Sequence, residues 1–164
     1  TKKASHIGFS AVGQLWKPGI WFEGVYHVLD NWNDYYEWIG GLDYTFDCQV
    51  YVMSEFFYKS CGKTKKQDYK LADWFLYYNG SSLGFIKNQM TILFSFPFQD
   101  LFTFTQTAVY SFSDKSCLMI PEIKYNIFPN IDILLRGIIY QGDDGKYFSS
   151  ELGSSVLFRM VLYY

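Results

Sequence analysis

Charged side chains and long apolar runs are both scarce in this sequence. Asp, Glu, Lys and Arg make up 18% of the 164 residues, whereas about a quarter is usual for a soluble domain. No run of about 18 apolar residues occurs, which excludes a transmembrane helix. The formal net charge of −2 argues against nucleic acid as a partner.

Cysteine is rare as well. The three cysteines, Cys48, Cys61 and Cys117, are odd in number and include no CxxC pair. Zinc and redox functions are therefore weakly supported, and we expect isolated thiols. A Cys61–Cys117 bridge between outer loops is the alternative.

Groups that could support catalysis are few. The two histidines, His6 and His27, fall on adjacent expected strands, and Ser10 is the nearest hydroxyl. A hydrolase needs a nucleophile and an orienting group at matching depth, and a metal site needs further ligands. We therefore expect ordinary polar histidines, no catalytic residues, no metal, no cofactor and no enzymatic activity.

Aromatic residues, by contrast, are abundant. The chain has 16 Phe, 15 Tyr and 5 Trp, or 22% of its residues. A soluble domain of this size has too little interior to bury so many rings. Rings are common where a surface meets lipid tails and headgroups.

Apolar and polar residues alternate in most of the chain, while the mean hydropathy is close to zero, at −0.05. This period-two pattern predicts strands over 5–16, 19–29, 37–46, 49–58, 89–98, 101–112, 117–128, 131–141 and 155–164. The facing of 101–112 is ambiguous, and Pro121 predicts a bulge or irregular edge in its strand. The pattern is typical of an all-β, antiparallel transmembrane β-barrel with about nine to ten visible strands.

The segment 59–85 is the exception to this alternation. It begins with a run of lysines and continues with Leu71, Trp74, Phe75 and Tyr78 at helical spacing. We predict a long extracellular loop with one short amphipathic helix over about 68–78, capped by Asp68 and stopped at Gly80. The helix folds into the lumen or lies over its mouth. The lysines form a solvated surface or contact anionic headgroups of outer-leaflet lipids.

Connection lengths predict an orientation. Short turns at 17–18, 47–48, 99–100 and 129–130 alternate with longer connections, and barrels place short turns on the periplasmic side. The C-terminus then also lies on the periplasmic side of the cell outer membrane of a Gram-negative bacterium. The opening TKKASHIGFSAVG lacks the features of a signal peptide. Nine strands is an odd number, so we expect 1–164 to be one barrel domain that forms the C-terminal portion of a larger barrel, or that a partner completes.

Several segments also resemble a group of porin-like outer-membrane proteins. The resembling segments are GIWFEGVYHV, WIGGLDYTFDCQVYVMSEFFY, DYKLADWFL, MTILFSFPF, AVYSFSDKSCLMIPEIKYNIFPNIDILLRGIIYQGDDG and the closing FRMVLYY. The closing stretch is similar to the last strand of such barrels, which ends on an aromatic residue after alternating hydrophobic ones. The resemblance implies the C-terminal half of a larger barrel and passive passage of solutes, and it carries no catalytic residue.

The charged residues of the expected strands share the phase that faces the lumen. We predict an acidic sector and a basic sector across a water-filled pore, which together create a transverse field. The alternative is that opposite charges pair and plug the lumen. The predicted pore-lining residues are Glu23, Asp43 and Glu55 in the acidic sector, Lys124, Arg136 and Arg159 in the basic sector, and Glu122 and Asp132 beside the latter.

Rings near the strand ends are predicted to form membrane-interface girdles, with carbohydrate stacking as the alternative. These residues are Trp16, Tyr26, Phe46, Tyr58, Phe98, Phe128 and Tyr164.

The predicted function is a porin-like channel for passive diffusion of small polar solutes or ions. Its partners are the lipid bilayer and further copies or other outer-membrane proteins. The alternative is a structural outer-membrane barrel that anchors or surrounds a partner complex. A third hypothesis, a soluble all-β sandwich, requires the apolar faces to pack on each other.

Overall fold

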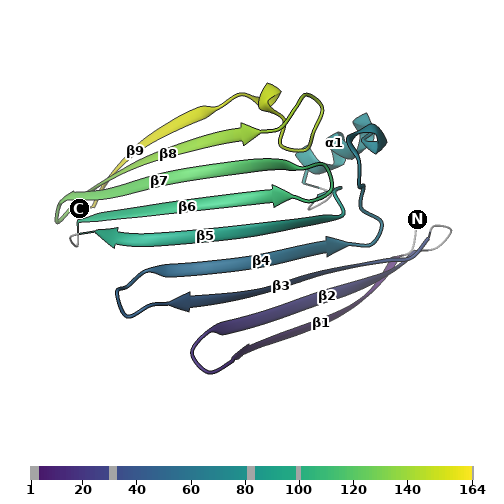
Figure 1. Cartoon of the computed structure of the whole chain (residues 1–164), viewed down its shortest axis with the longest axis horizontal. Coiled ribbons are helices and arrows are strands. Elements are labelled where there is room, and N and C mark those ends of the chain that lie inside the picture. Colours follow the sequence, from purple (N-terminus) through teal and green to yellow (C-terminus); the bar gives the residue numbers. More distant parts are fainter. Residues whose placement is uncertain (1–3, 30–32, 81–83, 99–100, 164) are drawn as a thin grey trace.

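The computed structural model describes residues 4–29, 33–80, 84–98 and 101–163, which form one antiparallel sheet with a single short α-helix (Figure 1). The strands are β1 (Ala4–Gln14), β2 (Gly19–Leu29), β3 (Tyr35–Thr45), β4 (Tyr51–Lys59), β5 (Asn88–Phe98), β6 (Phe102–Ser111), β7 (Ser116–Phe128), β8 (Ile131–Gln141) and β9 (Ser155–Leu162). Each strand pairs with the next one along the chain, in the order β1 to β9. The all-β antiparallel prediction is confirmed.

The sheet is open. β1 and β9 are its edges, and each pairs with one neighbour among the described strands. Figure 1 shows the nine strands side by side in one layer, with β1 and β9 at opposite margins. The described strands therefore do not close into a barrel.

The pairing register divides the strand residues between two faces. Side chains alternate along a strand, and register partners lie on the same face. One row of partners, for example, runs from Trp21 through Gly41, Glu55 and Thr91 to Val109. We call the face that carries this row the polar face and the opposite one the apolar face.

Every Asp, Glu, Lys, Arg and His of the nine strands lies on the polar face. These residues are His6, Glu23, His27, Glu37, Asp43, Glu55, Lys59, Glu122, Lys124, Asp132, Arg136 and Arg159. The separation results from the period-two pattern, which the register keeps in phase across all eight strand pairs.

The apolar face is covered by large hydrophobic side chains that remain exposed. Phe9 and Phe158, near its two margins, are each 65% exposed, and Phe94 in its centre is 38% exposed. Neighbouring rings pack across strands, as in the stacked pair Phe22 and Trp38 with centroids 5.8 Å apart. No described residue forms a second layer over this face, as a sandwich would require.

Connections differ between the two ends of the sheet. Residues 15–18, 46–50, 99–101 and 129–130 join strands at one end, which we call the short-turn edge. The two longest connections, 60–87 and 142–154, are both at the other end, the long-loop edge, where Figure 1 also places α1. The prediction of longer connections at this edge holds for these two, whereas 30–34 and 112–115 are no longer than the turn 46–50.

The buried core lies above the polar face at the long-loop edge. Phe85 and Ile86 from one long connection pack with Tyr147 and Phe148 from the other, and all four are at most 6% exposed. Residues partly buried against this cluster are Tyr69, Trp74 and Tyr77 of the first connection and Val109, Leu118 and Tyr140 of β6–β8. Since these strand residues belong to the polar face, the long loop folds inward over that face.

The loop helix differs from its prediction in its start and in its buried side. α1 (Leu71–Tyr78) follows a separate 3-10 turn at Lys66–Asp68, and Asp73, not Asp68, accepts the backbone N–H of Lys70 at 2.9 Å. Gly80 ends the helix with a φ of 75°, as expected.

Of the predicted apolar stripe of α1, only Trp74 packs into the core cluster, next to Tyr77. Leu71, Phe75 and Tyr78 are 86%, 68% and 64% exposed. These three side chains therefore do not join the core cluster, because a helix of two turns can place only one narrow side against it.

Pro121 interrupts the pairing of β7 with β8, because neither Ile120 nor Pro121 has a register partner on β8, and this is the edge-like irregularity that was predicted there. On its other side Pro121 pairs in register with Gln106, and the register shift of β7 lies between Asn126 and Phe128. Gly137 accommodates the proline ring, because a Cβ at Gly137 would lie 3.1 Å from Cγ of Pro121.

All three cysteines are free thiols, so the Cys61–Cys117 bridge is not formed. Within the described ranges, no helix has the length and apolar character needed to cross a bilayer.

Candidate functional site: the polar face

Four carboxylates follow one another along the wall formed by β2, β3 and β4. Successive register rows are Val25–Glu37, Glu23–Ile39, Gly41–Glu55 and Asp43–Met53, so each row contributes one acidic residue. Rows two residues apart on a strand are separated by about 6.6 to 6.8 Å. We call Glu37, Glu23, Glu55 and Asp43 the acidic ladder.

Neighbouring side chains hold two members of the ladder, Glu55 and Asp43, in place. Glu55 accepts a 3.2 Å hydrogen bond from the indole of Trp21, and Asp43 accepts a 3.0 Å hydrogen bond from Tyr51. Gly41 lies under the Trp21 ring and has no room for a Cβ, which explains a glycine at this position. Glu23 has no hydrogen-bond or ion-pair partner within the described part of the chain.

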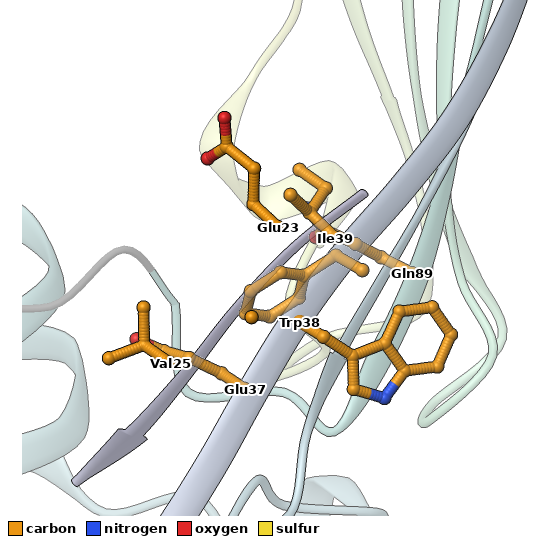
Figure 2. Close-up of a pocket in the computed structure, with 8 residues that line it drawn as sticks. Glu23, Val25, Glu37, Trp38, Ile39 and Gln89 are labelled. Atoms are coloured by element: carbon orange, nitrogen blue, oxygen red, sulfur yellow. The ribbon is translucent and has the colours of Figure 1, made fainter. Parts of the chain in front are cut away.

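A depression of about 330 Å³ lies beside Glu37 and Glu23, the two members of the acidic ladder nearest the long-loop edge. Val25, Ile39 and Phe57 form its apolar lining, and Glu23, Glu37 and Gln89 contribute polar groups. In Figure 2, Glu23 extends its carboxylate away from the strands, whereas Trp38 points in a different direction. The acidic wall therefore presents a hollow with a mainly apolar lining and a free carboxylate at its rim.

The central strands β5 and β6 carry no charged residue. Their polar-face positions include Thr91, Ser95, Thr103, Thr105 and Thr107, and the Ser95 and Thr105 hydroxyls are 3.2 Å apart. The threonines of the ambiguous segment therefore face the same side as the charges. They form a neutral hydroxyl wall between the two charged ones.

The wall of β7, β8 and β9 contains both signs in contact. Lys124 lies 2.9 Å from Asp132, and Nε of Arg136 donates to Glu122 at 2.6 Å. Only Arg159 has no ion-pair partner in this wall among the described residues. Acidic residues on the adjacent strand therefore neutralise two of the three cations of the predicted basic sector, which is the pairing of opposite charges that the alternative describes.

The Lys124–Asp132 pair belongs to a larger network at the short-turn edge. Asp132 is 6% exposed and also accepts hydrogen bonds from Asn126 at 2.7 Å and from the Tyr163 hydroxyl at 3.2 Å. The backbone N–H of Tyr163 donates to the carbonyl of Asn130 at 2.9 Å. This network ties the end of the last strand to the turn between β7 and β8.

A second polar chain crosses β1 to β4 near the long-loop edge. The Nδ1 atoms of His6 and His27 are 2.8 Å apart, and Nε2 of His27 is 3.0 Å from Glu37. Glu37 also lies 3.5 Å from Lys59, and Tyr35 stacks on His27 with ring centroids 4.2 Å apart. The sequence placed the two histidines on one face but did not reveal that Glu37 and Lys59 join them.

The long loop is fastened over the polar face by Asp114. Its carboxylate accepts hydrogen bonds from the Tyr69 hydroxyl at 2.9 Å, Ser116 Oγ at 2.7 Å and the backbone N–H of Tyr147 at 2.6 Å. Burial alone raises the pKa of Asp114, but these hydrogen bonds outweigh burial and hold the pKa below its usual value. Burial and the nearby Asp114 raise the pKa of the Tyr69 hydroxyl, which therefore stays protonated as a donor.

Each predicted pore-lining residue lies on the polar face: Glu23, Asp43, Glu55, Glu122, Lys124, Asp132, Arg136 and Arg159. Among the predicted interface rings, Tyr26, Tyr58, Phe98 and Phe128 lie on the apolar face, and Trp16 and Phe46 lie in short turns. Tyr164 is outside the described residues. Whether the two sets line a pore and meet headgroups stays a prediction.

No family model, curated protein or solved structure matches this chain. The resemblance to porin-like proteins therefore stays a prediction, and function has to be argued from the geometry. No cluster of three or more His, Cys, Asp or Glu side chains suited to a metal ion occurs in the described portion of the chain.

Proposed function

We propose that this chain forms part of the wall of a porin-like channel in an outer membrane. The polar face lines a water-filled pore and the apolar face contacts lipid. One observation carries the proposal: every Asp, Glu, Lys, Arg and His residue of the nine strands lies on one face, while the other face exposes rings and aliphatic side chains across the whole sheet. Soluble monomers rarely expose apolar patches larger than a few hundred Å².

The free edges add a requirement to this proposal. In hydrocarbon, every backbone N–H and C=O needs a partner, so β1 and β9 must both be paired in the membrane. β1 and β9 run in the same direction, because each strand is antiparallel to the next and an odd number of strands lies between these two. Antiparallel closure therefore needs an odd number of further strands, supplied by another segment of the protein or by a partner chain.

The charge distribution supports a preference for cations. The β2–β4 wall has four carboxylates and Lys59, a net charge of −3 with neutral His27, whereas the charges of the β7–β9 wall sum to +1. Acidic rings and walls select cations in pores because they raise the local cation concentration. The loop cluster over the polar face narrows the passage at the long-loop edge.

Reconstitution of the purified, folded protein into a planar bilayer tests the proposal. We expect discrete conductance steps. Under a potassium chloride gradient, the reversal potential should have the sign that indicates a preference for K⁺ over Cl⁻. Absence of conductance from folded protein would contradict the channel, and a lumen found filled by another chain would favour the structural barrel instead.

A further inference from the structure

The two histidines face each other across β1 and β2 in a geometry that suits a metal ion. His6 and His27 are direct register partners, with their Nδ1 atoms 2.8 Å apart and their rings at 78°. Two nitrogens bound at right angles to one ion, each at about 2.0 to 2.1 Å, lie about 2.8 to 3.0 Å apart. The same distance also fits a hydrogen bond between the two nitrogens, so the distance alone does not distinguish a metal ion from a proton between them.

The surroundings of His27 distinguish this pair from two solvated imidazoles. Its Nε2 lies 3.0 Å from Glu37 Oε1, and the Tyr35 ring stacks parallel to it at 10°. Because the carboxylate accepts a hydrogen bond from Nε2–H, the lone pair of His27 is on Nδ1, on the side of His6. A carboxylate behind the outer nitrogen is the usual support of a metal-binding histidine, since it fixes the tautomer and makes the ligand more basic.

We propose that His6 and His27 bind one divalent transition-metal ion through their Nδ1 atoms, with Glu37 as the positioning residue behind His27. The right-angle spacing fits the tetragonal sites of Cu²⁺ and Ni²⁺ better than a tetrahedral zinc site, in which two nitrogens lie about 3.4 Å apart. His6 is exposed on the edge strand, so water can fill the remaining coordination positions.

Charge around the pair also favours a cation. The nearest groups from the neighbouring strands are Glu37 of β3, Lys59 of β4 and the neutral Tyr35 ring. Glu37 offsets the charge of Lys59, and Glu23 follows Glu37 in the acidic ladder. The site concerns ion binding at the long-loop edge and does not depend on whether the sheet lines a pore.

The test is a titration of the folded, tag-free protein in detergent with CuCl₂, followed by calorimetry and electron paramagnetic resonance. We expect one ion per chain with two nitrogens in the equatorial plane. His6→Gln and His27→Gln should each weaken binding at least ten-fold. Glu37→Gln should weaken it by about ten-fold or more while both nitrogens remain bound, and the control Asp47→Asn should leave it unchanged.

The proposal is overturned if His6→Gln binds Cu²⁺ as tightly as the unaltered protein, or if the spectrum shows oxygen ligands only. His6 decides the matter if His27→Gln fails to fold, because His6 lies on the edge strand and its substitution removes no contact of the partly buried Glu37. Circular dichroism of each variant verifies that the strands are retained.

Discussion

The β2–β4 wall and the β7–β9 wall of the polar face carry charged residues to a similar extent but arrange them differently. On β2–β4 the carboxylates follow one another in successive rows, and Glu23 has no partner among the described residues. On β7–β9, Glu122 and Asp132 each contact a cation on the neighbouring strand. Contact between opposite charges cancels their field at a distance. The number of charges on a wall therefore says less about its field than their pairing does.

The largest expected effect comes from removing the charge of the acidic ladder. Glu23→Gln together with Glu55→Gln changes the net charge of the β2–β4 wall from −3 to −1. We expect the cation preference, measured as the reversal potential in a salt gradient, to fall several-fold toward no preference. The matched control is Glu122→Gln together with Arg136→Gln, which removes a pair without changing the net charge. Equal shifts in the two double variants would contradict the contrast between the walls.

A smaller but distinct effect is expected from breaking the network of the paired wall. Asp132→Ala leaves Lys124, Asn126 and the Tyr163 hydroxyl without their shared acceptor. A polar group left unpaired costs more than a hydrogen bond contributes, so the melting temperature should drop more than for Glu23→Gln. Thermal unfolding followed by circular dichroism compares the two variants, and an equal or smaller drop for Asp132→Ala would argue against the network.

The hydrogen bonds by which Asp114 fastens the long connections over the polar face, here called the loop clamp, should respond to acid in a defined direction. The pKa of Asp114 is lowered in the folded state, so its contribution to stability is complete above the unfolded value, near 3.8. It is lost as the pH falls through the folded value. The protection of the backbone amides around Tyr147, measured as hydrogen exchange relative to the intrinsic rate at each pH, should therefore be high at neutral pH and fall only below about pH 4.

The Asp114→Asn variant is the control for this response. It lacks the charge at every pH, so protection around Tyr147 should be low throughout and should lose its acid dependence. A loss of protection near pH 6 to 7 in the unaltered protein would point to a group other than Asp114.

The smallest effect is expected at Arg159, the cation of β9 that has no ion-pair partner in the described structure. Arg159→Gln removes a single positive charge from the paired wall, so cation preference should rise slightly. Conductance recordings under the same gradient as for the ladder variants measure it. An unchanged cation preference would show that Arg159 does not face the permeating ions.

The fold was largely predictable because its information is local. Alternation in 19–29 or 155–164 specifies both a strand and the face of each residue, and β2 and β9 keep that phase. Turn residues and the spacing around Trp74 likewise predicted where the pattern stops and a helix begins.

The parts that could not be predicted depend on register and on contacts distant in the chain. The pairing of Glu122 with Arg136 follows from which residues of β7 and β8 lie opposite each other, which alternation alone does not determine. The clamp joins Asp114 to Tyr147, 33 residues away in the chain. Glu37 lies in the predicted strand 37–46 in the same phase as Asp43, but its contacts with His27 and Lys59 depend on the register of three strands, which alternation does not determine.

The central claim is that the apolar face contacts lipid while the polar face contacts water, and two native tryptophans test it most directly. Trp38 lies on the apolar face and Trp21 on the polar face. In reconstituted single-tryptophan variants, brominated lipid should quench Trp38 strongly and Trp21 weakly, and aqueous acrylamide should do the reverse. Equal quenching of both rings by either reagent, or quenching of Trp38 by acrylamide alone, would contradict the account.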